Sequence, residues 1–67
     1  MLHITPWERQ ALQLLAQGKP IDDIGASLGV SGSDVALRVK ALFAKMGVTN
    51  PAEAIADALR RGLLVSP

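Results

Sequence analysis

The stretch of sequence that decides the fold is Ile24-Gly25-Ala26-Ser27-Leu28-Gly29-Val30-Ser31. A tight turn between two crossing helices needs a small residue where the backbones approach, and a glycine that reverses the chain. Gly25 meets the first need and Gly29 the second. Such a turn also needs apolar side chains that fix the crossing angle, and these are Ile24, Leu28, Val30 and Val35. The segment therefore predicts two short helices joined by the turn of a helix-turn-helix.

Capping signals on either side of this turn mark the other helix ends. Helix starts are indicated by Thr5-Pro6-Trp7-Glu8, Ser31-Gly32-Ser33-Asp34 and Asn50-Pro51-Ala52-Glu53. In each, a side-chain cap stands three residues before an acidic residue, and two of them have proline at the first helical position. Helix ends are indicated by Gln17-Gly18-Lys19-Pro20, Gly29, Gly47 and Arg60-Arg61-Gly62. We therefore expect helices over about 6–16, 21–28, 32–46 and 51–61.

Apolar residues recur at helical spacing within these segments. The expected apolar faces are Leu12 and Leu15 with Ala11 and Ala16, then Val35, Val39, Leu42 and Met46, then Ala54, Ile55, Ala58 and Leu59. No alternation of period two extends beyond a few residues, so no strand is expected. The prediction is an all-α, four-helix domain that takes up the single unit 1–67.

Composition limits the classes of protein to which the chain can belong. A chain of 67 residues forms one small domain, which buries only about 60% of its unfolded surface. Cysteine is absent, so packing alone must stabilise the fold, and a reducing compartment is expected. There is no run of about 18 apolar residues and no signal-peptide pattern, which favours a cytoplasmic protein without membrane partners.

Catalytic and metal-binding residues are scarce. His3 is the single histidine, tyrosine is absent, and no nucleophile has a base near it in sequence. Asp22 and Asp23 are adjacent, so on a helix their side chains diverge. We therefore predict that the chain is not an enzyme, with no catalytic residue, no metal site and no cofactor.

Several segments together resemble one known family. These are Ile4-Thr5-Pro6 with Glu8-Arg9, Leu12 to Gly18, Ile24 to Ser31, Val35, Lys45-Met46-Gly47-Val48 and Ala54 to Leu64. In this order and spacing they are similar to the LuxR-type (LuxR/FixJ/GerE) DNA-binding domain over nearly the whole chain. The resemblance implies a transcription regulator that binds duplex DNA, with the third helix in the major groove and the last helix pairing two copies into a homodimer. Family members usually carry this domain as the C-terminal output domain of a response regulator, so an N-terminal regulatory domain or a separate regulator protein is an expected partner.

The resemblance also implies which residues meet DNA and which meet the second copy. By position, Ala36, Leu37 and Lys40 correspond to residues that face base edges, whereas Arg38, Lys45 and the acidic Asp22 and Asp34 flank the phosphate backbone. The implied DNA-binding set is Ala36, Leu37, Arg38, Lys40, Lys45, Ser33 and Asp34. The implied dimer interface is Ala52, Ile55, Ala56 and Leu59, and Ala58 is expected to add to its smooth surface.

Departures from the family pattern weaken the expected DNA contacts. Family members often have threonine at Asp34, lysine at Ala36 and histidine at Arg38. The net charge is only +1, and Asp22, Asp23 and Asp34 would repel phosphates. Each aspartate also has a structural explanation in the first turn of a helix, where negative charge is favourable, and Asp34 is in position to cap its helix with Ser31.

Two apolar residues allow two explanations each. Leu37 is either a contact residue on the outside of the third helix, for a thymine methyl group or a protein partner, or it is an ordinary surface leucine. Trp7 is either an interface anchor or a packing residue against Leu2 and Ile4.

Two alternative functions follow from these features. One is a divergent helix-turn-helix with weakened DNA affinity that acts as a protein–protein interaction or dimerisation module. The other is region four of a bacterial sigma factor, which shares Glu8-Arg9, the Ile24 to Ser31 turn and the arginine at Arg38. The complete helix after Gly47-Val48 fits the LuxR-type pattern better.

Overall fold

Residues 3–64 fold into four helices, as the sequence predicts. The computed structural model describes residues 3–64, and the helices are α1 (Pro6–Ala16), α2 (Ile21–Leu28), α3 (Gly32–Met46) and α4 (Pro51–Arg60). α4 ends one residue before the expected boundary, because Arg61 is its C-cap. No strand occurs within the described residues. The all-α fold class is therefore confirmed.

The helix starts follow from the capping residues. At α1, the Thr5 hydroxyl accepts a hydrogen bond from the Glu8 N–H at 3.2 Å, and the Glu8 carboxylate accepts one from the Thr5 N–H at 2.9 Å. At α4, the Asn50 side chain accepts from the Glu53 N–H at 2.9 Å. These bonds satisfy N–H groups that have no partner inside the helix, so each helix begins at a defined residue.

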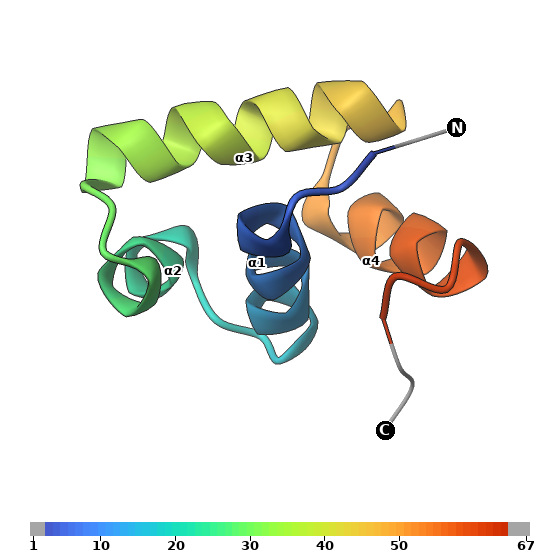
Figure 1. The fold of residues 1–67 in the computed structure, drawn as a ribbon, viewed down its shortest axis with the longest axis horizontal. Coiled ribbons are helices and arrows are strands. Elements are labelled where there is room, and N and C mark those ends of the chain that lie inside the picture. Colours follow the sequence, from blue (N-terminus) through green and yellow to red (C-terminus); the bar gives the residue numbers. More distant parts are fainter. Residues whose placement is uncertain (1–2, 65–67) are drawn as a thin grey trace.

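α3 lies across the other three helices (Figure 1). α2 packs beneath its N-terminal end, α4 lies near its C-terminal end, and α1 lies between them (Figure 1). One side of α3 therefore faces the rest of the molecule along its whole length, and the other side is left to solvent.

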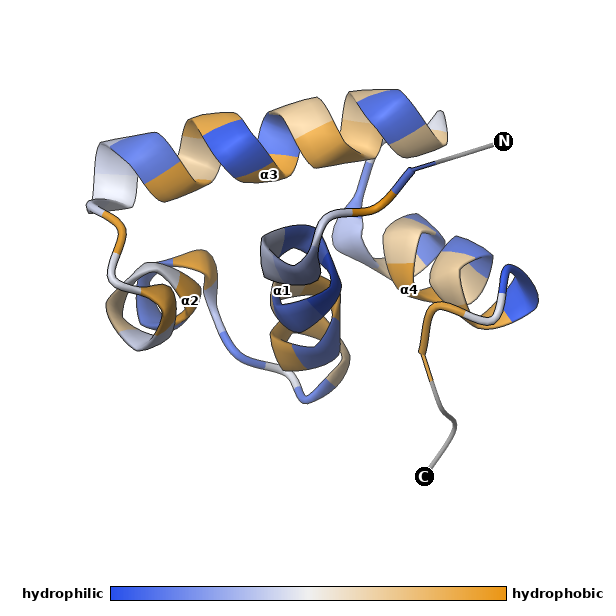
Figure 2. Ribbon diagram, viewed as in Figure 1, coloured by the Kyte–Doolittle hydropathy of each residue, from blue (hydrophilic) through white to orange (hydrophobic). Residues whose placement is uncertain are grey.

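Two clusters of buried side chains form the core. The first joins Leu12 to the C-terminal half of α3, to α4 and to the segment after α4, through Leu42, Met46, Ala54, Ala58 and Leu64. The second joins α1 to α2 and the N-terminal half of α3, through Ala11, Leu15, Ile24, Val35 and Val39. Apolar and hydrophilic bands accordingly alternate along α3 (Figure 2). Burying one such leucine or isoleucine fully contributes roughly 1.5–3 kcal/mol, so these few side chains supply much of the stability.

The expected apolar faces largely turn inward, except that on α4 Leu59 is 42% exposed. Val35, Val39, Leu42 and Met46 are all buried. On α1, however, Ala16 is exposed, and Leu14 is half-buried against the second cluster instead. Ala16 is the last residue of α1, and the helical period alone did not determine its exposure.

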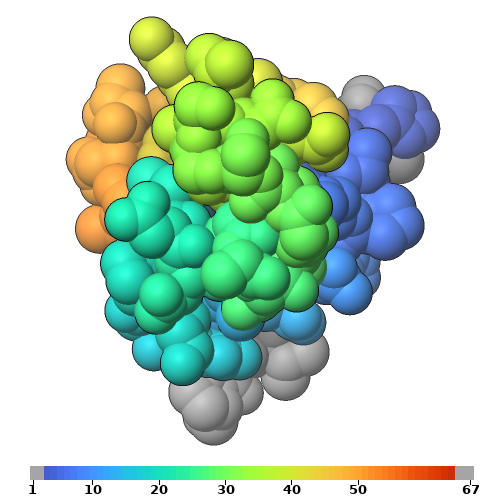
Figure 3. All heavy atoms as spheres, turned by 90° about the vertical axis from the view of Figure 1, so that its left-hand side faces the viewer, coloured from blue at the N-terminus to red at the C-terminus, as the bar shows by residue number. Residues whose placement is uncertain are grey.

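The turn between α2 and α3 has the geometry that the sequence predicts. Gly29 adopts a left-handed conformation, with φ of 72°, and ends α2. The Val30 N–H then donates to the Gly25 carbonyl at 2.8 Å. At Gly25, an added Cβ would lie 2.8 Å from the Val30 carbonyl oxygen and 3.1 Å from Val35 Cγ1. α2 and the start of α3 consequently form one continuous surface (Figure 3).

Gly25→Ala is predicted to destabilise the domain by about 1–3 kcal/mol, because the new methyl group must displace backbone rather than a flexible side chain. Urea unfolding followed by circular dichroism measures this change. Gly32→Ala is the matched control, since a Cβ there meets no atom closer than Asp22 Oδ1 at 3.9 Å. We expect Gly32→Ala to leave stability unchanged or slightly raised. Equal losses in both variants would contradict the close approach at Gly25.

Candidate nucleic-acid interface

The solvent side of α3 carries most of the expected site residues. Ser33, Ala36, Leu37 and Lys40 are all exposed, and the Leu37 side chain is 66% exposed. Because Val35 and Val39 anchor the opposite side, these residues are held on a rigid, outward-facing helix surface. We call Ser33, Ala36, Leu37 and Lys40 the outer face of α3.

Three exposed acidic residues lie in the first turns of α2 and α3. Asp22 and Asp23 lie exposed in the first turn of α2, and Asp34 lies exposed in the first turn of α3. The Asp34 N–H donates to the Ser31 hydroxyl at 3.4 Å, but within residues 3–64 the Asp34 carboxylate makes no hydrogen bond back to Ser31. Asp34 thus complements the helix dipole without closing a capping box, and its charge remains at the surface.

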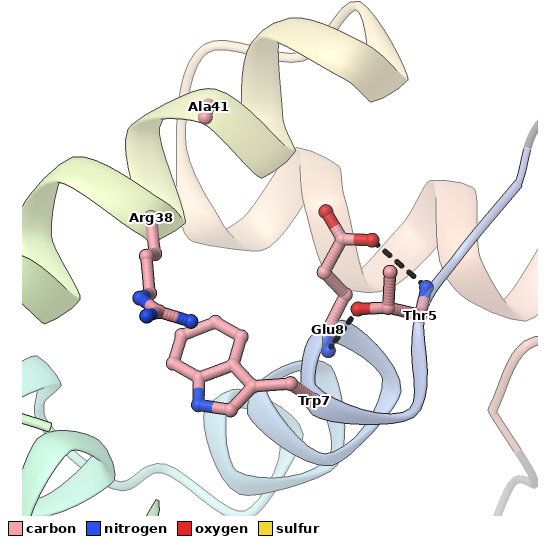
Figure 4. A pocket seen from close by; sticks show the side chains of 5 residues that line it. All are labelled: Thr5, Trp7, Glu8, Arg38 and Ala41. Carbon is pink, nitrogen blue, oxygen red and sulfur yellow. Dashed lines mark hydrogen bonds between the residues drawn. The ribbon is translucent and has the colours of Figure 1, made fainter.

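Arg38 lies on the flank of α3 that faces the start of α1. Its guanidinium covers the Trp7 ring, with Cζ 5.3 Å from the ring centroid, which is cation–π geometry. The two side chains line one edge of an open hollow of about 240 Å³, together with Thr5, Glu8 and Ala41 (Figure 4). Trp7 also packs against the second core cluster, whereas Ile4 packs against the first. Leu2, the other expected neighbour of Trp7, lies outside the described residues.

Lys45 links α3 to the N-terminal segment. Its ammonium donates to both Glu8 carboxylate oxygens, at 2.8 and 3.0 Å, and to the His3 carbonyl at 3.0 Å. Burial opposes the ionisation of Glu8, but the hydrogen bonds from Lys45 and Thr5 outweigh it and hold the pKa of this carboxyl below its usual range. Lys45 is therefore already engaged by three oxygen atoms and is less available to a phosphate than Arg38 or Lys40.

α4 presents a narrow apolar stripe to solvent. Ala52 and Ala56 are exposed, Leu59 is 42% exposed, and Ile55 is half-buried against both core clusters. The expectation that Ala58 contributes to this stripe is wrong, because its side chain is fully buried. Alanine is small enough for either environment, so the sequence did not determine which way Ala58 faces.

Asp57 is buried on α4 although it is charged, with only 7% of its surface exposed. Arg61 Nε lies 2.6 Å from one carboxylate oxygen, and an Arg60 guanidinium nitrogen lies 2.8 Å from the other. The hydrogen bond from Arg61 is the main cause that holds the pKa of Asp57 below its ordinary value of 3.8. The three residues close the C-terminal end of α4, where cations also complement the helix dipole.

Sequence reasoning missed three of these arrangements. The Trp7–Arg38 stack and the Glu8–Lys45 pair join residues far apart in the chain, and no local sequence pattern predicts them. The Asp57–Arg61 pair has the i,i+4 spacing of a helical ion pair, so the sequence could have revealed it.

The described part of the chain offers little for other chemistries. Residues 3–64 contain no group of three or more histidine or acidic side chains that could hold a metal ion. Among the helices described, none has the length and apolar character needed to cross a membrane.

Comparison with known proteins identifies the family. The model of the luxR family of bacterial regulatory proteins matches residues 3–58. The chain belongs to this LuxR family. The resemblance expected from the sequence is therefore confirmed, and the matched region includes the outer face of α3 and most of α4.

Two curated relatives of this LuxR-family chain come from Mycobacterium tuberculosis, strains CDC 1551 / Oshkosh and ATCC 25618 / H37Rv. Both are described as "Probable transcriptional regulatory protein NarL", and both are 42% identical over 57 residues. The match covers 85% of this chain but only 26% of each relative, so the chain spans about a quarter of their length. No solved structure is significantly similar to the chain.

The Asp57 arrangement predicts a pH dependence of stability. Because the pKa of Asp57 is lower in the folded state, its contribution is fully present above the ordinary value of 3.8 and is lost as the pH falls through the folded value. Asp57→Asn should thus be less stable than the wild type near neutral pH, and the difference should shrink on acidification. Thermal unfolding from about pH 7 to about pH 2 measures both curves. Asp23→Asn, at an exposed carboxylate, is the control and should lose stability on acidification as the wild type does. Stability curves that run parallel for the wild type and Asp57→Asn would contradict the prediction.

Proposed function

We propose that this chain is the DNA-binding output domain of a transcription regulator, with α3 in the major groove of duplex DNA. The observation that carries the proposal is the rigid, exposed outer face of α3 in a chain of the LuxR family. A helix about 10–12 Å across fits a major groove about 12 Å wide. The curated relatives are described as transcriptional regulatory proteins, and most of their length lies outside this chain. We therefore infer that a regulatory domain or separate regulator protein controls the domain.

Lys40 and Arg38 are the cations that we assign to DNA. Lys40 lies on the outer face, where its ammonium can donate to guanine O6 or N7. Arg38 lies on the flank, where a guanidinium suits a two-point contact with a phosphate. Leu37 can contact a thymine methyl group, and Ser33 and Ala36 allow close approach. Base readout is accordingly sparse.

The acidic residues reduce the affinity that this surface can reach. Asp34 lies exposed in the first turn of α3, and Asp22 lies close to this turn, with its Oδ1 3.9 Å from a Cβ added at Gly32; Asp23 is exposed in the first turn of α2. Carboxylates there repel the phosphate backbone. As salt rises, both this repulsion and the attraction by Lys40 and Arg38 become weaker. We expect modest affinity that depends on two well-placed cations rather than on overall charge.

The exposed stripe of α4 supports a homodimer as the DNA-binding form. Ala52, Ala56 and Leu59 stand at i, i+4 and i+7, so two copies of α4 can pack closely around a two-fold axis. Ile55 borders the stripe but also packs in the core, so substituting it would alter both. Leu59 is the better residue for testing the interface.

Leu37 is the observation that favours an alternative function. An exposed leucine on a face with only one lysine also suits a protein partner, and the acidic residues beside it would then repel DNA. The two functions differ in their dependence on salt and on the α3 cations.

Arg38→Ala and Lys40→Ala should each weaken DNA binding. Arg38→Ala should also lower the salt dependence, by about 0.9 in the slope of log K against log salt for each phosphate that is no longer neutralised. Lys40→Ala should also change the preference among operator sequences, whereas Arg38→Ala should act uniformly. Fluorescence anisotropy with labelled duplexes at several salt concentrations measures both effects. Lys19→Ala, in the exposed α1–α2 connection, is the matched control and should leave the slope unchanged. If all three variants kept the affinity and the slope of the wild type, the protein-binding alternative would be favoured.

Leu59→Glu and Leu37→Glu form a matched pair that separates dimerisation from DNA contact. Both replace an exposed leucine, so neither should greatly destabilise the monomer. Leu59→Glu should abolish self-association in sedimentation velocity, because two like charges would meet at the two-fold axis. Leu37→Glu should leave self-association intact and weaken DNA binding at the level of each domain. Self-association that survives Leu59→Glu would rule out the α4 interface.

A further inference from the structure

Tryptophan at position 7 lowers the stability of the fold if its only role is to pack in the core. Its indole Nε1 is buried, and within residues 3–64 it has no hydrogen-bond partner. A buried N–H without a partner costs about 1–3 kcal/mol, which phenylalanine or leucine would avoid in the same apolar surroundings. What the indole offers beyond packing is the ring that binds a cation best, and one face of this ring is covered by Arg38.

The guanidinium of Arg38 is held but not neutralised. Glu8 lines the same hollow, yet its carboxylate is engaged by Lys45 at 2.8 and 3.0 Å. Among the residues that the structure describes, no carboxylate forms an ion pair with Arg38, and no acceptor takes its N–H donors. Arg38 Cζ lies over the ring, and no other residue drawn in Figure 4 takes the guanidinium donors, which remain for an incoming anion.

An alternative partner for Arg38 lies one helical turn away. Asp34 precedes it by four residues on α3, the spacing at which acidic and basic side chains commonly pair. Such a pair would occupy the guanidinium with an internal carboxylate. In the structure Arg38 lies against Trp7 instead, and no Asp34–Arg38 pair forms.

We propose that Trp7 is a positioning residue for the contact of Arg38 with DNA phosphate. The indole ring of α1 holds the guanidinium on the α1 flank of α3, away from Asp34, with its donors directed at solvent. DNA binding then does not have to break an internal ion pair or to order a long side chain. This inference rests on the proposed function, and it extends the interface from α3 to the first turn of α1.

A double-mutant cycle with DNA tests the proposal. The variants are Trp7→Leu, Trp7→Phe, Arg38→Ala and the combination of Trp7→Leu with Arg38→Ala, with affinity measured by anisotropy at low salt. Trp7→Leu should weaken binding roughly 2- to 5-fold, which corresponds to the strength of an exposed cation–π contact. In the Arg38→Ala background it should have no further effect. Trp7→Phe should retain part of the affinity and replaces Trp7→Leu in the cycle if that variant does not fold.

A spectroscopic signal separates positioning from packing. Trp7 is the only tryptophan, so its indole N–H gives one NMR signal that reports on this ring. The signal should shift when DNA is added to the wild type and should stay fixed in Arg38→Ala. Leu14→Ala is the packing control, since Leu14 is half-buried in the same cluster; while folded, it should bind DNA like the wild type.

Two outcomes would overturn the inference. An equal loss of affinity from Trp7→Leu in the wild-type and Arg38→Ala backgrounds would mean that the ring acts independently of Arg38. A similar loss from Leu14→Ala would mean that core packing alone is responsible. Failure of the proposed function would look different, because the wild type itself would then show no salt-dependent binding.

Discussion

The approach of α2 to the following turn at Gly25 is the constraint on which the rest of the structure depends. With an added Cβ only 2.8 Å from the Val30 carbonyl oxygen, no larger residue fits without moving backbone. This approach fixes the angle at which α3 leaves α2, and Val35 beneath it is fully buried. The side of α3 that faces solvent is therefore set by packing, before any charge is considered. In the function that we propose, a surface fixed in this way docks on DNA without the entropic cost of ordering a loop.

The distribution of ion pairs then decides which cations remain for a partner. All seven Lys and Arg residues lie within the described chain, and three of them, Lys45, Arg60 and Arg61, pair with Glu8 or Asp57. Of the cations outside these pairs, only Arg38 and Lys40 belong to α3. A net charge of +1 therefore understates the positive charge that the α3 surface can present to an anionic partner. It overstates the positive charge that the rest of the molecule can present. The same pairs tie α3 to the N-terminal segment and close the end of α4.

Local signals account for what the sequence predicted well. Thr5, Ser31 and Asn50 each cap a helix because their side chains reach an N–H three residues ahead, and this needs no tertiary information. The buried stripe of α3 was predictable for the same reason, since Val35 and Met46 follow the helical period.

Tertiary information was needed for the remainder. Glu8 and Lys45 are 37 residues apart, and only the crossing of α1 and α3 brings them together. The Trp7–Arg38 stack has the same origin. Ala58 was expected both on the apolar face with Ala54 and in the dimer stripe, because the helical period of α4 gives the spacing of its faces but not which one turns inward; the structure buries it. DNA contacts carried over by position likewise need the geometry, which shows that Lys45 is already engaged and Arg38 is not.

An NMR titration with random-sequence duplex DNA tests the central claim most directly, namely that the outer face of α3 and its Arg38 flank bind DNA. The isotope-labelled domain is titrated at low salt and again at about 200 mM salt, where phosphate-driven binding weakens steeply. The account predicts salt-sensitive shifts that are centred on Leu37, Arg38 and Lys40 and are small on the α1–α2 connection. Unchanged α3 signals at low salt, with the fold intact, would contradict it.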